Sequence, residues 1–514
     1  MSNILFVCAE NDGINNCKAG GMGDVVRDVP RQISQFGDKV SVLTPSYGRL
    51  HVNQKKIVDL HFLYRGKSQL AELYEVEPKR QMDGLTHYVI HHPEIKSGNI
   101  ADIYFDDPEQ PFYTDACTFS IFCIAAAQAI NDNCFGNLDV AHLHDWHTSL
   151  LLFLKNYHPQ YKNLNSIRFV YSIHNLAIQG IRPFNNNYSS LQSFYPEVSW
   201  SEHDLVDPRY KDCINLMAIG IRFSDAVHTV SESYKEDILK PSKFPDFIGG
   251  EGLENDLTAA NNDQKLFGIL NGSNYSNINE EEAGAFYRNA VRAIFKWLQK
   301  PDKQYKSEFL IHTGEKIADL MEQPPSFICA SVARLTQQKF YMLKAHPESL
   351  EAILKSLKKV NGIYVILGTG APEYEAFFRA LSYTHKNLVF FNGQSEEVID
   401  SIYTESNLYL MPSLFEPCGI SQMLAMRNGQ PCLVHATGGL KDTVQHLKTG
   451  FVFDGDTLKS KSENMVKVFN EALDLYFNNK RTWNKISKKA KSERFTWSKV
   501  VKEYYSKLYN LPLD

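Results

Sequence analysis

The chain has 514 residues, which is enough for two or three domains with buried cores. Lys and Arg number 54 and Asp and Glu 59, so the formal net charge is −5, too weak for a protein that binds nucleic acid through its charge. Hydrophobic residues make up 43% of the sequence and no tract is dominated by one residue type, so we expect a globular protein rather than a disordered one.

The sequence gives little sign of a membrane or secreted protein. The apolar run 121–130 is shorter than the ~20 residues that a membrane helix needs. The opening run 1–10 lacks a basic region and is predicted to be a strand rather than a signal peptide. Nine scattered cysteines with no Cys-x-x-Cys pair indicate neither a disulfide framework nor a zinc site. We therefore expect a protein of the cytoplasm, or of a plastid-like reducing compartment, that binds neither membrane nor nucleic acid.

Short apolar runs alternate with helical stretches along the chain, a pattern typical of parallel sheets covered by helices. In the first half, a long apolar helix is predicted over 115–131, and the predicted strands are 4–9, 39–44, 87–91, 139–144, 169–173 and 226–230. In the second half, helices are predicted over 373–383 and 396–405, and the predicted strands are 327–335, 362–368, 388–391, 408–412, 431–436 and 450–453. The fold class predicted is α/β, with two Rossmann-like domains facing an interdomain cleft.

A polar segment rich in Gly and Asn, 249–264, separates the two halves and is predicted to be a hinge or linker. The N-terminal domain is accordingly expected at 1–255 and the C-terminal domain at 265–480. Ligands of open α/β sheets bind beyond the carboxyl ends of the strands. Functional residues are therefore expected in the loops that follow the predicted strands.

A glycine-rich loop, Lys18-Ala-Gly-Gly-Met-Gly-Asp-Val25, follows the first predicted strand and precedes a helical stretch over 26–36. Backbone N–H groups at a helix start favour an anion, Gly20 and Gly21 let a ligand come close, and Lys18 adds a positive charge. The loop is therefore predicted to bind a phosphate. It departs from the dinucleotide-binding fingerprint, since Val26 occupies the third glycine position, and a plain strand-to-helix turn is the alternative.

Histidines follow two strands of the first half. In His142-Leu-His-Asp-Trp-His147, alternation places His142 and His144 on the same face of a strand. The spacing matches no standard zinc motif and no cysteine is near, so structural histidines are favoured over metal ligands. After the next strand, His174 and Asn175 form a polar pair that suits sugar hydroxyls, with a structural role as the alternative.

Charged residues follow strands of the second half. Arg334 ends one strand and Lys339 lies in the next loop, a pair suited to stabilising a leaving nucleoside diphosphate, or else two solvated surface charges. In Met411-Pro-Ser-Leu-Phe-Glu-Pro-Cys-Gly419, Glu416 can orient sugar or ribose hydroxyls and the amides around Cys418 can hold phosphate. Thr437-Gly-Gly439 again places glycines before a helix. No local base is evident to activate Cys418 as a nucleophile.

Taken together and in this order, these segments resemble the family of bacterial glycogen synthases and plant starch synthases, which are retaining glycosyltransferases. The resemblance spans most of the chain and rests on Lys18-Ala-Gly-Gly-Met-Gly-Asp24, His144-Asp-Trp-His147, Ile173-His-Asn175 with Gln179-Gly180, Thr229-Val-Ser231, Gly268-Ile-Leu-Asn-Gly272, Arg334-Leu-Thr-Gln-Gln-Lys339, Phe415-Glu-Pro-Cys-Gly419 and Thr437-Gly-Gly-Leu440. It implies the two-domain GT-B architecture, with the glucan mainly on the N-terminal domain, the donor mainly on the C-terminal domain, and a C-terminal helix over 481–514 that returns to the N-terminal domain.

The resemblance also implies a reaction and a set of residues. Glucose would pass from a nucleotide sugar to the non-reducing end of an α-1,4-glucan, with no metal or other cofactor; ADP-glucose is favoured as the donor and UDP-glucose is the alternative. The catalytic residues would be His174, Arg334, Lys339 and Glu416. The donor-binding residues would be Lys18, Gly20, Gly21, Asn175, Asn271, Cys418, Gly419, Thr437, Gly438 and Gly439. The acceptor-side residues would be Glu10, Asp145 and Trp146.

Several residues depart from the family's pattern, which indicates a divergent member. Ala218 stands where a lysine is usual, Leu414 where an arginine is usual and Phe340 where a glycine is usual, and Ala19 and Met22 alter the glycine-rich loop. Two alternatives to the synthase reaction therefore stay open. One is a catalytically weak glucan-binding or regulatory protein with the same fold, and the other is a related transferase with a different donor or acceptor.

Overall fold

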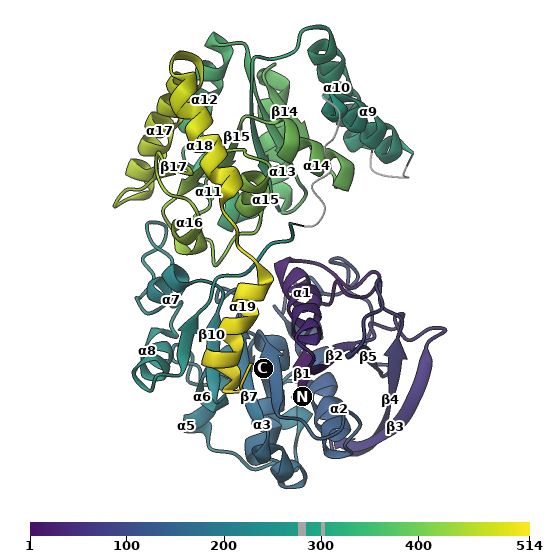
Figure 1. Ribbon diagram of the computed structural model, residues 1–514. Helices are drawn as coiled ribbons and strands as arrows, with labels where there is room; N and C mark the ends of the chain where they lie inside the picture. The colour runs from purple at the N-terminus through teal and green to yellow at the C-terminus, as the bar shows by residue number, and fades with distance from the viewer. Residues whose placement is uncertain (276–283, 300–303, 514) are drawn as a thin grey trace. The chain divides into compact units, whose positions relative to one another are not determined.

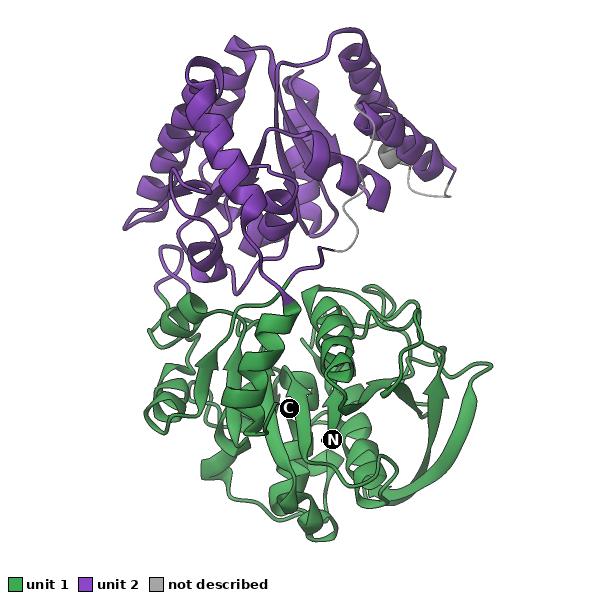
Figure 2. Ribbon diagram, viewed as in Figure 1, with its two compact units in different colours: residues 1–242, 249–272, 497–514 green, residues 243–248, 273–496 purple. Residues whose placement is uncertain are grey.

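The computed structural model describes residues 1–275, 284–299 and 304–513, and the chain divides into two units (Figures 1 and 2). Unit 1 comprises residues 1–242, 249–272 and 497–514, and unit 2 comprises residues 243–248 and 273–496.

The structure corrects two of the predicted boundaries. Residues 249–264 are not a linker, because Leu253 and Leu257 are buried and the segment forms helix α8 (Glu254–Asn262) within unit 1. The C-terminal segment joins unit 1 only from Trp497, later than the predicted start at 481. Helix α18 (Lys480–Ser492) stays in unit 2, where it packs against two helices of that unit, α15 (Ser421–Arg427) and α17 (Leu458–Asn478).

Unit 1 is built on a nine-stranded sheet with the order β11-β10-β7-β6-β1-β2-β5-β4-β3. Its strands are β1 (Asn3–Val7), β2 (Lys39–Pro45), β3 (Lys55–Tyr64), β4 (Lys67–Val76), β5 (Leu85–His91), β6 (Val140–His144), β7 (Arg168–Ile173), β10 (Ala226–Thr229) and β11 (Leu266–Gly268). The strands are parallel except where β4 pairs with β3 and with β5. Two short strands, β8 (Ile181–Pro183) and β9 (Cys213–Asn215), pair separately.

The helices of unit 1 include one that is mostly apolar and almost completely buried. Helix α2 (Tyr113–Asn131) is long and apolar enough to cross a membrane by composition, but 83% of that window is buried inside the protein, as expected for a core helix. The other helices of unit 1 are α1 (Gly21–Gln35), η1 (Trp146–Thr148), α3 (Leu150–Tyr157), η2 (Pro159–Ser166), α4 (Leu191–Phe194), α5 (Glu202–Leu205), α6 (Leu216–Phe223), α7 (Glu232–Ile238), α8, α19 (Trp497–Glu503) and η3 (Tyr504–Tyr509).

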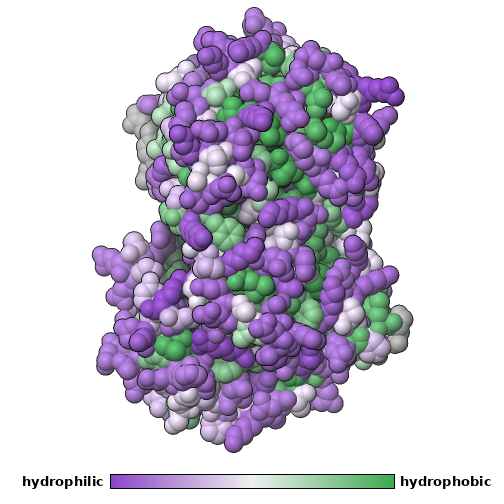
Figure 3. All heavy atoms as spheres, turned by 90° about the vertical axis from the view of Figure 1, so that its left-hand side faces the viewer, coloured by the Kyte–Doolittle hydropathy of each residue, from purple (hydrophilic) through white to green (hydrophobic). Residues whose placement is uncertain are grey.

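Hydrophilic side chains make up most of the face of the molecule drawn in Figure 3.

Unit 2 is built on a fully parallel sheet with the order β14-β13-β12-β15-β16-β17. Its strands are β12 (Phe327–Val332), β13 (Gly362–Leu367), β14 (Leu388–Phe391), β15 (Leu408–Met411), β16 (Cys432–His435) and β17 (Gly450–Phe453). Its helices are α9 (Ala285–Leu298), α10 (Gln304–Glu322), α11 (Gln337–Ala345), α12 (Pro347–Lys359), α13 (Pro372–Thr384), α14 (Glu396–Glu405), α15, α16 (Gly438–Thr443), α17 and α18.

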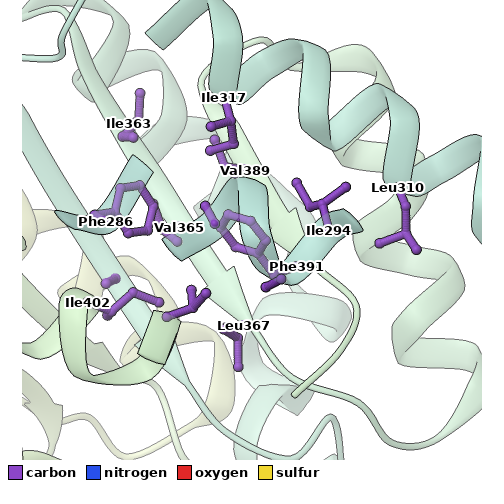
Figure 4. Close-up of a cluster of buried hydrophobic side chains, with 14 residues drawn as sticks. Phe286, Ile294, Leu310, Ile317, Ile363, Val365, Leu367, Val389, Phe391 and Ile402 are labelled. Atoms are coloured by element: carbon purple, nitrogen blue, oxygen red, sulfur yellow. The ribbon is translucent and has the colours of Figure 1, made fainter. Parts of the chain in front are cut away.

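Buried side chains from helices α9, α10 and α14 pack against β12, β13 and β14 in one hydrophobic cluster of unit 2 (Figure 4). Phe286 and Ile294 reach this cluster from α9, and Val365 and Phe391 reach it from the sheet. A second cluster joins β15 and β16 to α15 and α18. The helices therefore cover a buried parallel sheet, as its continuous apolar strands predict.

The structure confirms all the strands predicted in both halves and their parallel arrangement, as well as the helix over 115–131. The sequence does not predict the β3–β4 hairpin, because the first five residues of β3 are exposed and form no apolar run. It also misses β8, β9 and β11, which have three residues each.

Candidate active site

Each sheet has one position at which successive strands are added on opposite sides, and α/β proteins bind ligands at such switch points. In unit 1 it lies between β1 and β6, and in unit 2 between β12 and β15. Glu10 and the glycine-rich loop follow β1, and Asp145 follows β6. Lys339 and Glu416 lie in the loops and helix starts after β12 and β15. These five features therefore lie at the switch points of the two sheets, whereas His174 and Asn175 follow β7, Asn271 follows β11 and Thr437 follows β16.

The glycine-rich loop of unit 1 binds a carboxylate of the protein itself. Glu10 is buried, and its Oε2 accepts hydrogen bonds from the backbone N–H groups of Ala19 (2.8 Å) and Gly20 (2.5 Å). Its Oε1 accepts a hydrogen bond from the Tyr104 hydroxyl at 2.8 Å. A side chain added at Gly21, the first residue of α1, would meet no atom within 4 Å. The amides of Ala19 and Gly20 are therefore occupied by the Glu10 carboxylate, whereas the space beside Gly21 is open, and the predicted binding of a phosphate to this loop stays a prediction.

Lys18 lies in a cluster of ion pairs beside this loop. Its Nζ is 2.7 Å from Oδ1 of Asp24 and 3.7 Å from Oδ2 of Asp12. Asp12 also pairs with Arg27 and Lys79, and although burial alone would raise the pKa of Asp12, these cations lower it. The Lys18 side chain is 40% exposed, and exposed ion pairs contribute little free energy. Lys18 can therefore leave Asp24 for a ligand at small cost.

Asp145 has a strained backbone and a buried carboxyl group. Its φ of 54° with ψ of −178° lies in a region that costs a residue other than glycine about 1–3 kcal/mol. Its Oδ1 accepts a hydrogen bond from the backbone N–H of His174 at 2.7 Å. Burial raises the pKa of Asp145 to about 7, although hydrogen bonds from the backbone of His174 and Asn175 oppose this rise. Strain and a shifted pKa at one buried residue are typical of a functional site.

His174 is half-buried and contacts a second histidine. Its Nε2 lies 2.9 Å from Nδ1 of His144, and the two rings stack with their centroids 5.2 Å apart. His142 stacks on His144 at 4.5 Å, which confirms that these two side chains share a face of the sheet. Burial lowers the pKa of His174 to about 3 and that of His142 and His144 well below the usual value, so all three rings are neutral at pH 7.

Two other predicted residues of unit 1 are almost fully buried. The ring of Trp146 packs against Gly180, and any side chain at Gly180 would collide with it. Asn271 is 4% exposed, and its Oδ1 has no hydrogen-bond partner among residues 1–275, 284–299 and 304–513. A buried polar atom without a hydrogen-bond partner is uncommon in folded proteins.

The centre of the site in unit 2 is an ion pair. Nζ of Lys339 donates to Oε2 of Glu416, and the Ser413 hydroxyl donates to the same oxygen at 3.0 Å. The Glu416 side chain is 5% exposed and that of Lys339 is 19% exposed. The backbone N–H of Leu414 bonds to the carbonyl of Gln338 at 2.7 Å, which ties the two loops together. Arg334, at the carboxyl end of β12, is exposed.

Two close backbone approaches shape the loop after Glu416. The backbone N–H of Gly439 donates to the carbonyl of Glu416 at 3.0 Å, and a side chain at Gly439 would lie 2.3 Å from the Cys418 carbonyl oxygen. Gly419 has a φ of +73°, and Nε2 of Gln422 donates to its carbonyl at 2.7 Å. The glycines therefore bring Thr437 and Gly438, at the start of α16, beside the loop that carries Glu416 and Cys418.

Three of the residues that depart from the family's pattern, Ala218, Phe340 and Leu414, are buried. Ala218 is fully buried in α6, where its N–H donates to Oδ1 of Asn215 at 3.0 Å. Phe340 packs edge-on against Phe378, with ring centroids 5.1 Å apart, and Leu414 is 4% exposed. These side chains fill the interior of their units, and the Lys339–Glu416 pair of unit 2 is kept.

The predicted residues fall into two groups, one in each unit. Unit 1 brings together Glu10, Gly20, Asp145, His174 and Asn175 through hydrogen bonds and charge. Unit 2 brings together Lys339 and Glu416, with Cys418 and Gly439 beside them.

The sequence interpretation missed Ser413, Asp12 and the contact of His144 with His174. Ser413 could have been found, because it precedes Glu416 by three residues in the same loop. Within the described part of the chain, no group of three or more His, Cys, Asp and Glu side chains could hold a metal ion.

Known protein families and individual relatives both match this chain over most of its length. The family model described as starch synthase catalytic domain matches residues 3–259, and the model described as glycosyl transferases group 1 matches residues 315–493. A glycogen synthase of Lachnospira eligens is 30% identical over 99% of this chain and 100% of its own length. A glycogen synthase of Bacillus cytotoxicus is 31% identical, with 99% and 98% covered.

Solved structures show the same fold. The catalytic domain of starch synthase IV from Arabidopsis thaliana, bound to ADP and acarbose, has a TM-score of 0.74 and 22% identity and covers 99% of both chains. Sucrose-phosphate synthase from Thermosynechococcus elongatus has a TM-score of 0.55 and 14% identity, with 99% of this chain and 98% of its own covered. The architecture is the two-domain, GT-B-like one.

Proposed function

We propose a reaction for this chain from one established premise: the chain belongs to the family of glycogen synthases and starch synthases, and it is a glycosyltransferase. The proposed reaction transfers glucose from a nucleotide sugar to the non-reducing end of an α-1,4-glucan. We favour ADP-glucose over UDP-glucose as the donor. The starch synthase of similar fold was solved with ADP bound, which supports an ADP-linked donor.

The buried Lys339–Glu416 ion pair is the observation that carries the proposal. A leaving nucleoside diphosphate gains negative charge in the transition state, and a fixed cation stabilises that charge. Lys339 is held in place by Glu416, and the exposed Arg334 follows the same strand, β12, five residues before Lys339. Glu416 in turn presents a carboxylate to hydroxyl groups of the donor glucose. The glycines at 438 and 439 let the donor come close to this loop.

The reaction would retain the anomeric configuration by attack on one face. The bond between the anomeric carbon and the diphosphate oxygen breaks, the acceptor hydroxyl oxygen bonds to the same face, and the departing phosphate takes the hydroxyl proton. No protein nucleophile is needed, and Cys418, 5% exposed, serves as part of the wall. Glu10, Asp145 and Trp146 would lie on the acceptor side, and Asn271 would line the donor pocket.

We also infer that the protein acts in a reducing compartment such as the cytoplasm. None of its cysteines, at 8, 17, 117, 123, 134, 213, 329, 418 and 432, is joined to another by a disulfide bond. Proteins of oxidising compartments pair such residues in disulfides far more often.

Glucose transfer to glycogen tests the proposal. Labelled ADP-glucose and UDP-glucose are each supplied to the wild type, to Glu416→Ala and to the matched control Glu351→Ala, which alters an exposed carboxylate of α12. We expect incorporation from ADP-glucose that Glu416→Ala lowers by at least a hundredfold and the control leaves unchanged. A folded wild-type protein that binds glycogen but incorporates no label would support the glucan-binding alternative instead.

A further inference from the structure

Two buried imidazoles form a hydrogen bond near the switch point of unit 1. His144 is the last residue of β6, and its Nδ1 lies 2.9 Å from Nε2 of His174, which follows β7. His144 is fully buried and also stacks on Phe6, with ring centroids 5.5 Å apart. His174 is only half-buried. The pair therefore connects a fixed interior ring to a ring that reaches the site.

Each of the two rings carries one proton at neutral pH. Burial lowers the pKa of His174 to about 3 and that of His144 well below its usual value. In a pair of neutral rings joined through Nδ1 of one and Nε2 of the other, one nitrogen donates and the other accepts. The position of one proton therefore fixes the tautomers of both histidines.

Either His144 or His174 can be the donor of this hydrogen bond, and the surroundings of Nε2 of His144 distinguish the two cases. This atom is buried and has no hydrogen-bond partner within residues 1–275, 284–299 and 304–513. A proton on Nε2 would leave a buried N–H group unpaired, at a cost of about 1–3 kcal/mol. A proton on Nδ1 leaves only a lone pair unpaired there, and buried unpaired acceptors are more common in proteins than buried unpaired N–H groups. His144 is therefore the donor.

We propose that His144 is a positioning residue that fixes His174 as the tautomer protonated at Nδ1. His144 donates from Nδ1, and His174 accepts at Nε2 and keeps its own proton on Nδ1. What this tautomer means for the reaction rests on the proposed function. His174 then offers a hydrogen-bond donor to a sugar oxygen and is not the base for the acceptor hydroxyl, whose proton goes to the departing phosphate.

A neighbouring chain of hydrogen bonds has the opposite tautomers and provides an internal control. Nε2 of His228 lies 3.3 Å from the carbonyl oxygen of Ile269, which can only accept, so His228 carries its proton on Nε2. Ser172 then donates to Nδ1 of His228 at 2.7 Å and accepts from Nε2 of His142 at 2.6 Å. Tyr509 completes the chain by donating to Nδ1 of His142 at 2.9 Å. His142 and His228 are therefore protonated at Nε2.

Nitrogen NMR of the full-length protein labelled at histidine tests the proposal without an activity assay. The two-bond couplings between ring carbon-bound protons and ring nitrogens distinguish the tautomers, and signals are assigned by their loss in His144→Asn and His174→Gln. We expect His144 and His174 to be protonated at Nδ1 and His142 and His228 at Nε2. A wild-type His174 protonated at Nε2, or a charged His174 at pH 7, would overturn the proposal even if the enzyme synthesises glucan.

Two substitutions at position 144 test its effect on His174. His144→Phe keeps a stacking ring but removes the donor, and His144→Asn places an amide N–H close to the position of Nδ1. We expect His144→Phe to lower kcat about tenfold with little change in the KM for the donor, and His144→Asn to recover most of that loss. Equal kcat values for His144→Phe and the wild type would contradict the positioning role. If the wild type transfers no glucose, the proposed function fails, while the NMR result still decides the tautomer.

Discussion

At the scale of single residues, the Lys339–Glu416 pair is expected to contribute both to glucose transfer and to the stability of unit 2. Glu416 is 5% exposed and Lys339 is its partner, so Lys339→Ala leaves a buried carboxylate without its cation, beside the Ser413 hydroxyl. We expect Lys339→Ala to abolish glucose transfer and to lower the free energy of unfolding by about 3 kcal/mol, the lower end for buried pairs because Lys339 is 19% exposed.

The double variant Lys339→Ala/Glu416→Ala separates the two effects. It is expected to be more stable than Lys339→Ala in urea unfolding, because it removes the unpaired charge, and yet to stay inactive. Lys355→Ala, which alters an exposed lysine of α12, is the matched control. Additive losses of stability in the double variant would show that Lys339 and Glu416 do not interact.

At the scale of elements, strands β6, β7 and β10 and the turns after them bring together buried histidines whose pKa values are lowered by burial. These residues are His142, His144, His147, His174 and His228. Between pH 6.5 and about 4 the unfolded chain binds protons at these rings and the folded chain does not. Their contribution to stability is thus present above pH 6.5 and is lost as the pH falls. Asp115 and Asp145, whose pKa values burial raises to about 7, oppose this trend but are fewer.

The free energy of unfolding in urea is therefore expected to fall steadily from pH 6.5 to pH 5. His147→Phe should reduce this slope by about 1.4 kcal/mol per pH unit, the value for one proton. Nδ1 of His147 has no hydrogen-bond partner in the described part of the chain, so this substitution removes little else. His203→Ala, at a side chain that is 95% exposed, serves as the control. A slope that His147→Phe leaves unchanged would contradict the account.

The strands of unit 2 show how much of the fold and of the site a single sequence can predict. Strands such as β13 and β16 were predictable because a buried parallel strand is a continuous apolar run, and the residues after them because ligands bind at the carboxyl ends. The Lys339–Glu416 pair was not, since its members are 77 residues apart and meet only because β12 and β15 are neighbours. Nor did any local pattern show that the Glu10 carboxylate would accept hydrogen bonds from the backbone N–H groups of Ala19 and Gly20.

At the scale of the whole molecule, the account predicts a transferase that works without a metal ion. The negative charge of the leaving diphosphate is assigned to Lys339 and Arg334 rather than to a cation such as Mg²⁺. We expect glucose transfer to be unchanged after dialysis against EDTA and in its presence. Activity that EDTA abolishes and added Mg²⁺ or Mn²⁺ restores would contradict this assignment.

The extension of a short maltooligosaccharide of defined length tests the central claim most directly. The purified protein is incubated with ADP-glucose and the oligosaccharide, and the products are separated by mass spectrometry and their new linkage is identified by proton NMR. We expect a series of products in which each is one glucose longer than the last, with every new glucose joined by an α-1,4 bond at the non-reducing end. Transfer to a different acceptor, a β-linked product or an unextended oligosaccharide would contradict it.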